Sequence, residues 1–256
     1  MTHFLEYVPG NSLLHKMNPI SKLFGALLVS IACFCTSNLV FLALVIVFDA
    51  ALAKSCNMVK QALGLAKAVF IFSIILAILL IFTTPSGVQL VPLPWGYIGT
   101  GSILAALTTI VRLVAAAVPL FLVLYVTKLS DITNSLVKVV HVPYKYAFMF
   151  SSVVRFIPVF MNDMSGIMEA QTARGVEFDS GSFIKKVRLM VPLCVPLLVS
   201  SVRKTNSSAI AAEVRGFNLR THSSGYKDYP FAPLDVAVLV GGVLLVAIAI
   251  LLRVLL

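Results

Sequence analysis

Two short cassettes near the end of the chain place an arginine beside a glycine: Ala173-Arg174-Gly175 and Val214-Arg215-Gly216. Each closes a long segment with a helical pattern, and an acid, Glu169 or Glu213, precedes it. A basic side chain at a helix end interacts favourably with the helix dipole, which is its simplest role. The guanidinium is also a planar fork of donors that pairs well with a carboxylate. Two arginines in the same setting therefore predict two matched tips that dock into two equivalent grooves of a partner, such as a dimer.

The composition indicates that these helices fold in lipid. Hydrophobic residues make up 59% of the 256-residue chain and charged residues only 12%, with a mean hydropathy of +1.00. A soluble domain has about 25% charged residues, so the sequence predicts an all-α integral membrane protein. The net charge of +10 could indicate nucleic acid as a partner. The collection of basic residues on the cytoplasmic side of membrane proteins explains it more simply, and we expect no nucleic-acid binding.

Five apolar runs are candidates for membrane spans, each of which needs about 20 residues. They are residues 20–37, 39–53, 68–82, 99–126 and 234–256. Glycine and proline are frequent in 83–98, where we expect a loop. The predicted organisation is a membrane domain with four transmembrane helices at 1–126, a cytoplasmic coupling domain at 127–232, and a fifth transmembrane helix at 233–256 that completes the membrane domain.

The basic residues assign a side of the membrane to each connection. Lys16 precedes the first run and Lys22 lies in its first turn, and Lys54, Lys60 and Lys67 lie between the second and third runs. Most other Lys and Arg residues lie in the insert after the fourth run, whereas the two connections on the opposite side carry no charge. Because basic residues mark cytoplasmic segments, we expect the N-terminus and the coupling domain in the cytoplasm.

The pattern of the insert predicts one short and two long helices. A short helix is expected at 131–140, where the sequence His141-Val142-Pro143 would end it. The long helices are expected at 144–173 and 183–215. The glycine of each cassette then follows directly after a long helix, at the position that favours a left-handed backbone.

Apolar residues repeat every seven positions along the first long helix. Phe150, Ile157 and Met164 form one row, and Val153 begins a second. A heptad repeat of this kind forms a seam that packs on another helix. Pro158 lies within the helix and should kink it.

Asp49 and Arg112 fall in the interior of predicted spans, where a charge is costly and should face protein or water. Arg112 could contact Asp49 or another helix, or it could lie at a wet edge; Asp49 could lie near the end of its short span. The sequence contains no phosphate-binding loop, no zinc motif, no nucleophile elbow and no row of intramembrane acids. We therefore expect no enzyme activity, no metal site and no cofactor.

Several motifs together suggest a family. The first is the run Ser12-Leu13-Leu14-His15-Lys16-Met17-Asn18-Pro19 before the first span. The others are Arg155-Phe156-Ile157-Pro158, Glu169-Ala170-Gln171-Thr172-Ala173-Arg174-Gly175, Val191-Pro192-Leu193 and Glu213-Val214-Arg215-Gly216. With these motifs the chain resembles the transmembrane T component of energy-coupling factor (ECF) transporters, a family that includes the membrane subunit of cobalt and biotin uptake systems. Val214 replaces the alanine usual in the family, which enlarges that helix tip.

The resemblance implies a mechanism. Two ATPase subunits would form a cytoplasmic dimer, and the tips with Arg174 and Arg215 would dock in one groove on each. A small substrate-binding membrane protein, the S component, would lie against the long helices. ATP-driven closing of the dimer would reorient it and release a vitamin or transition-metal ion inside a prokaryotic cell. The residues expected to pack on another helix or contact the S component are Phe150, Val153, Arg155, Ile157, Pro158 and Met164.

Two other functions remain open from the sequence. A self-sufficient secondary carrier or channel with a cytoplasmic regulatory domain would need a polar path, for which the spans offer mainly Asp49 and Arg112. A membrane-anchored scaffold would have no role in transport. Copurified ATPase subunits would favour the coupling subunit, whereas transport by the purified chain alone would favour the carrier.

Overall fold

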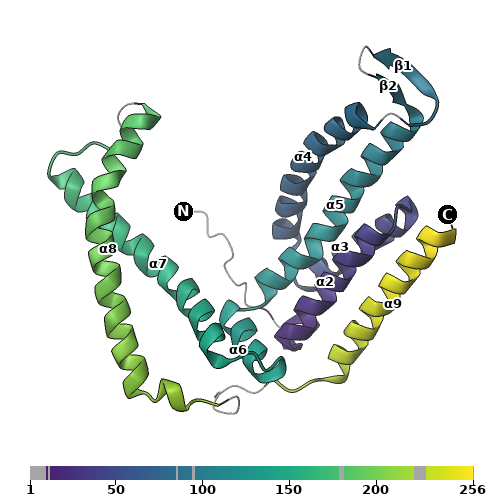
Figure 1. Cartoon of the computed structure of the whole chain (residues 1–256). Coiled ribbons are helices and arrows are strands. Elements are labelled where there is room, and N and C mark those ends of the chain that lie inside the picture. Colours follow the sequence, from purple (N-terminus) through teal and green to yellow (C-terminus); the bar gives the residue numbers. More distant parts are fainter. Residues whose placement is uncertain are drawn as a thin grey trace. The chain divides into compact units, whose positions relative to one another are not determined.

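The structure, a computed structural model, describes residues 10, 12–84, 86–93, 96–178, 182–221 and 229–255 (Figure 1). The predicted all-α architecture is confirmed, because the regular structure of the described residues is helical apart from one short hairpin. The chain divides into two compact units. The membrane unit comprises Met1–Ser135 and Tyr229–Leu256, and the helix-pair unit comprises Leu136–Asp228.

Six helices of the described residues belong wholly to the membrane unit. They are α1 (Leu13–Lys16), α2 (Pro19–Cys35), α3 (Leu39–Ser55), α4 (Val59–Thr83), α5 (Thr100–Val126) and α9 (Pro233–Leu255). The helix α5 is central, because it packs against α2, α3 and α4, while α2 also packs against α9. Glycines permit the close contact between α2 and α9: a Cβ atom at Gly25 would lie 2.7 Å from Val238, and one at Gly242 would lie 2.9 Å from Leu28.

Side-chain caps determine where the first two long helices begin. The Asn18 side chain accepts a hydrogen bond from the Ile20 N–H at 3.1 Å, and Pro19 occupies the first turn, where its missing N–H is tolerated. The Asn38 side chain accepts from the Val40 N–H at 2.9 Å. The turn between α2 and α3 is therefore short because a cap restarts the helix at once.

Three helices of the described chain are both long and apolar enough to cross a membrane: α4, α5 and α9. Each of α2 and α3 has 17 residues, or about 26 Å, against a hydrocarbon core of about 30 Å. That these two helices also cross the bilayer stays a prediction.

Three local expectations need correction. The segment 83–98 is not all loop, because β1 (Gln89–Leu93) and β2 (Gly96–Gly99) pair antiparallel. Glycine and proline favour a turn, but proline is also compatible with an edge strand, so their presence did not exclude a hairpin. The helix α4 begins nine residues before its apolar run, since hydropathy locates the bilayer and not the helix end. The short helix α6 spans Leu129–Val139 and not 131–140.

The helix-pair unit consists mainly of two long helices, α7 (Tyr144–Ala173) and α8 (Phe183–Val214), followed by the 3₁₀ turn η1 (Phe217–Leu219). The predicted long helices are thus confirmed, with Arg215 as the C-cap of α8. Proline does not interrupt either helix, since α7 continues through Pro158 and α8 through two further prolines. The kink expected at Pro158 stays a prediction.

Candidate functional site

The first tip is a complete Schellman motif at the end of α7. The Gly175 N–H donates to the Thr172 carbonyl at 2.9 Å, and the Val176 N–H donates to the Gln171 carbonyl at 3.1 Å. Gly175 has φ +89°, so the predicted left-handed glycine is confirmed. These bonds satisfy carbonyls at the helix end and leave Ala173, Arg174 and Gly175 exposed.

The second tip, at the end of α8, is built in a related way. The Gly216 N–H donates to the Glu213 carbonyl at 2.9 Å, and Gly216 has φ +68°. The chain then continues into η1 instead of leaving the helix end freely. Val214 is 83% exposed, so this tip presents an apolar side chain next to the Arg215 guanidinium.

The two arginines are available to a partner and lie far apart. Both side chains are exposed, and neither guanidinium forms a hydrogen bond or ion pair with a residue that the structure describes. Phe217, two residues after Arg215, packs on Tyr144 at the start of α7 with ring centroids 5.5 Å apart. Arg174 lies at the other end of α7, which is about 45 Å long. The tips therefore stand at opposite ends of one helix pair.

An aromatic cluster holds the segment after Arg215 against α7. The Phe217 ring also packs edge-on against Phe148, with centroids 4.8 Å apart. The Arg220 guanidinium donates to the Tyr144 hydroxyl at 2.6 Å and lies 5.2 Å from the ring centroid, a cation–π contact. This cluster lines a groove of about 290 Å³ that Arg215 and Arg155 also border. The surroundings of Arg215 are thus more structured than those of Arg174.

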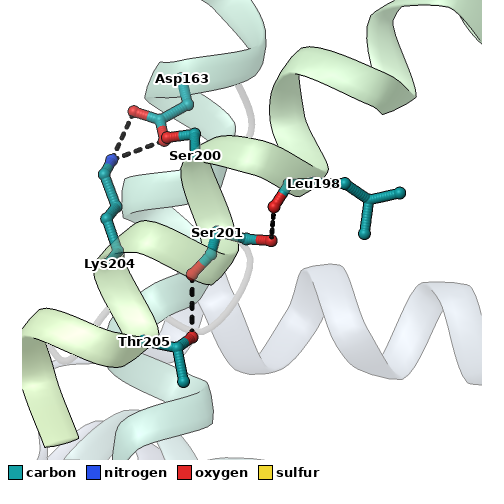
Figure 2. A network of polar contacts seen from close by, with 6 residues as sticks. All are labelled: Asp163, Leu198, Ser200, Ser201, Lys204 and Thr205. Carbon is teal, nitrogen blue, oxygen red and sulfur yellow. Dashed lines mark hydrogen bonds and ion pairs between the residues drawn. The ribbon is translucent and has the colours of Figure 1, made fainter.

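One ion pair fastens the two long helices to each other where they pack. In Figure 2 the Asp163 carboxylate of α7 faces Lys204 and Ser200 of α8. The Lys204 ammonium donates to Asp163 Oδ1 at 2.7 Å, and the Ser200 hydroxyl donates to Oδ2 at 2.9 Å. These two hydrogen bonds, Lys204 first, lower the pKa of Asp163 from its ordinary value. Ser201 and Thr205 bond only to backbone of their own helix.

The predicted seam on α7 is mostly unpacked within this chain. Phe150, Val153 and Ile157 are more than half exposed, and Met164 is half-buried. Arg155 and Pro158 are exposed as well, and the Arg155 guanidinium lies 5.4 Å from the centroid of the neighbouring Phe156 ring. A second apolar row follows α8 at helical spacing. Its exposed members are Val187, Val191, Val195, Leu198 and Val202.

Comparison with known proteins agrees with this architecture. The sequence matches the family model described as cobalt transport protein over residues 10–224. It is 31% identical over 252 residues to the energy-coupling factor transporter transmembrane protein EcfT of Brevibacillus brevis, covering 95% of each chain. This chain belongs to that family.

Two further relatives carry the same name. The EcfT protein of Limosilactobacillus fermentum is 33% identical over 236 residues, covering 88% of this chain and 87% of the relative. The EcfT protein of Clostridium kluyveri is 30% identical over 261 residues, covering 97% and 96%. The similarity therefore extends over both units, and it confirms the family suggested by the motifs.

Within the membrane unit of this family member, Arg112 supports a turn between helices. Its Nη2 donates to the Thr36 carbonyl at 2.9 Å and to the Ser37 hydroxyl at 3.1 Å. Of the roles left open for Arg112, the structure therefore shows a contact with another helix end. The guanidinium completes the end of α2, where unpaired carbonyls need donors.

Asp49 is a different case, because its carboxylate is 2% exposed and neither oxygen has a hydrogen-bond partner among the described residues. It lines an apolar cavity of about 420 Å³ between α2, α3, α5 and α9, which Lys22 also borders. No hydrogen bond joins Asp49 to Arg112. Among the described residues no group of three or more His, Cys, Asp or Glu side chains is arranged to hold a metal ion.

Several features of the site were not predicted from the sequence. The Asp163–Lys204 pair joins residues 41 positions apart, and no spacing rule connects them. The cluster around Phe217 depends on the return of η1 to the start of α7, which only the tertiary structure shows. An aromatic residue directly after the second cassette is the one signal that could have suggested it.

Proposed function

We propose that this chain is the non-catalytic T component of an ECF-type importer, which passes ATP-driven motion from two cytoplasmic ATPase subunits to a membrane-embedded S component. The observation that carries the proposal is the pair of glycine-capped helix ends, each presenting an exposed arginine at an opposite end of one helix pair. Two separate tips suit two grooves on an ATPase dimer, and a guanidinium fork suits a carboxylate in each groove.

The unpacked apolar rows support the second partner. An amphipathic helix normally buries its apolar stripe, yet α7 and α8 each keep one exposed in the described structure. A hydrophobic S component lying on these rows would cover them, with Phe150, Val153 and Ile157 at the contact. The cargo follows from the family resemblance as a vitamin or transition-metal ion. It is recognised by the S component, so this chain need not carry a cargo site.

The same proposal assigns the two units to their places. The helix-pair unit is the coupling domain in the cytoplasm, within the boundaries 127–232, and the segments 1–126 and 233–256 form the membrane domain of a prokaryotic cell membrane. A self-sufficient carrier has less support, because Arg112 and Asp49 do not line a common polar path. Arg112 donates to the α2–α3 turn, and Asp49 faces an apolar cavity.

The docking role predicts the effect of charge reversal at the tips. Arg174→Glu and Arg215→Glu each replace a donor fork with an acid that repels a carboxylate groove. We expect each to lower recovery of copurified ATPase subunits roughly tenfold, the loss of one charge-assisted pair. Arg203→Glu, an equal charge change at an exposed position within α8, is the control and should not change recovery. Undiminished recovery with both tip variants would discard the docking role.

Lysine substitutions at the two tips distinguish the contribution of the planar guanidinium from that of its positive charge. Arg174→Lys and Arg215→Lys keep the positive charge but lose the planar fork. We expect membrane insertion at the normal level and reduced uptake of whichever compound the copurified S component binds. Equal uptake by the wild type and both lysine variants would contradict a fork-specific contact.

A further inference from the structure

Both chain connections between the two units meet at one polar cluster at the start of α2. The cluster consists of Asn18, Asp131, Tyr229 and Asp235, all in the membrane unit. Asp131 lies just before the chain enters the helix-pair unit at Leu136, and Tyr229 is the first residue after it returns. We call these four residues the polar node.

The centre of the node is a buried carboxylate that joins two helix starts. Asp235 is fully buried, and its Oδ1 accepts a hydrogen bond from the Asn18 N–H at 3.0 Å. Its Oδ2 accepts from the Ala232 N–H at 2.8 Å, at the start of α9. A carboxylate near a helix N-terminus is stabilised by the helix dipole. One side chain thus fixes the beginning of α9 to the beginning of α2, more than 200 positions away in the sequence.

Two further bonds connect the returning chain to the outgoing chain. The Asn18 side-chain amide donates to the Tyr229 carbonyl at 3.0 Å, and the Tyr229 hydroxyl donates to Asp131 Oδ1 at 3.0 Å. Burial, followed by the nearby Asp131 charge, raises the pKa of Tyr229 to about 12. The phenol therefore stays protonated under physiological conditions and keeps the proton that it donates.

This arrangement differs from an ordinary pair of helix caps. A cap needs only local partners, whereas the Tyr229–Asp131 bond spans the insert and closes its two ends on each other. Asn18, 4% exposed, makes three bonds at once, to Ile20, Asp235 and Tyr229. Any displacement of either connection must therefore act on the start of the first predicted span.

We propose that the polar node is the pivot through which motion of the helix-pair unit reaches the membrane helices, with Tyr229 and Asp131 as positioning residues for coupling. This inference rests on the proposed function. The polar node is the route by which motion of the arginine tips is transmitted to the membrane unit. The tips receive the motion, and the node converts it into a change at the starts of α2 and α9.

The test compares variants that open the bond with variants that keep it. Tyr229→Phe removes only the donor hydroxyl, and Asp131→Ala removes the acceptor independently. Asp131→Asn keeps an oxygen that can accept the same bond and should behave like the wild type. Tyr125→Phe is the matched control, because the Tyr125 hydroxyl has no hydrogen-bond partner among the described residues.

The readout is ATP-dependent movement in the whole transporter complex. Spin labels are placed at Leu104→Cys on α5 and Ile210→Cys on α8, both exposed, after replacement of Cys35 and Cys194. Pulsed electron paramagnetic resonance then measures the distance between the two spin labels with and without ATP. We expect the ATP-induced shift to fall roughly two- to tenfold in Tyr229→Phe and Asp131→Ala, while ATPase recovery and ATP hydrolysis stay near wild type.

The outcomes distinguish the two proposals. Full ATP-induced shifts in both Tyr229→Phe and Asp131→Ala would overturn the pivot and leave the docking function intact. An equal loss in Tyr125→Phe or in Asp131→Asn would also overturn it, because the effect would not follow the bond. Absence of copurified ATPase from the wild type would instead refute the proposed function, and the pivot with it.

Discussion

At the scale of single residues, backbone conformation and side-chain charge cooperate at the two tips. Glycine tolerates the positive φ that ends each long helix, and the residue before it is the arginine that a partner would contact. Both arginine side chains stay exposed beside these left-handed turns. A tip of this kind is narrow because its last carbonyls are already paired with backbone N–H groups.

Alanine in place of a glycine with positive φ should therefore lower stability, whereas alanine in place of a glycine within a helix should raise it. Gly216→Ala places a Cβ on a backbone with φ +68°, and we expect a loss of about 1–2 kcal/mol in stability of the unit. Gly166→Ala, in the interior of α7 with no atom near the added Cβ, should raise stability by about 0.5–1 kcal/mol. Thermal unfolding of the purified protein measures both. A stabilising Gly216→Ala would contradict the left-handed turn.

At the scale of elements, the α7–α8 pair depends on few contacts between its helices. The apolar rows face away from the partner helix, so the Asp163–Lys204 pair supplies a specific part of the attachment. Because the folded pKa of Asp163 is lowered, its contribution is present above the ordinary pKa of aspartate and is lost as the pH falls through the folded value.

The attachment between α7 and α8 should accordingly weaken at acid pH. We expect amide hydrogen exchange in α7 and α8, corrected for its intrinsic pH dependence, to show weaker protection as the pH drops below about 4, the unperturbed aspartate value. Asp163→Asn should remove this pH step and show weaker protection at neutral pH. Glu169→Gln, which neutralises an exposed acid on the same helix, should retain the step. If the pH-dependent loss of protection persists in Asp163→Asn, another titrating group is responsible for it.

At the scale of the whole molecule, the distribution of charge predicts the orientation of the chain in the membrane. Lys54, Lys60 and Lys67 flank the junction of α3 and α4, while the β1–β2 hairpin lies in a segment without any charged residue. The basic side is expected to face the cytoplasm. Both arginine tips then reach the compartment that holds ATP.

This orientation is testable with cysteines introduced one at a time after replacement of Cys35 and Cys194 by serine, since the two cysteines that remain, Cys33 and Cys56, are buried. Leu219→Cys, near the second tip, should react with a membrane-impermeant maleimide only in inside-out vesicles. Val88→Cys, beside the hairpin, should react only in intact cells or right-side-out vesicles. Both positions are exposed, at 84% and 74% respectively, so burial would not explain a missing reaction. Reaction of Leu219→Cys from outside would reverse the predicted topology.

Features that depend on local sequence patterns were predicted from the sequence, whereas contacts between residues far apart in the chain were not. Helix limits such as Tyr144–Ala173 and the left-handed Gly175 follow from periodicity and capping, which neighbouring residues determine. The hairpin was missed because proline and glycine suit a turn and an edge strand alike. Contacts such as Asp163–Lys204 and Asn18–Asp235 join distant positions, and one sequence holds no signal that would pair them.

Proline within the long helices has a mechanical consequence. Each proline removes one backbone hydrogen bond, so Pro158 in α7 and both Pro192 and Pro196 in α8 mark compliant points in helices that otherwise remain intact. The helix measures about 24 Å from Pro158 to Arg174, and about 29 Å from Pro196 to Arg215. These two helix segments are thus of similar length, and a pull on either tip would bend its helix first at a proline, where a backbone hydrogen bond is missing.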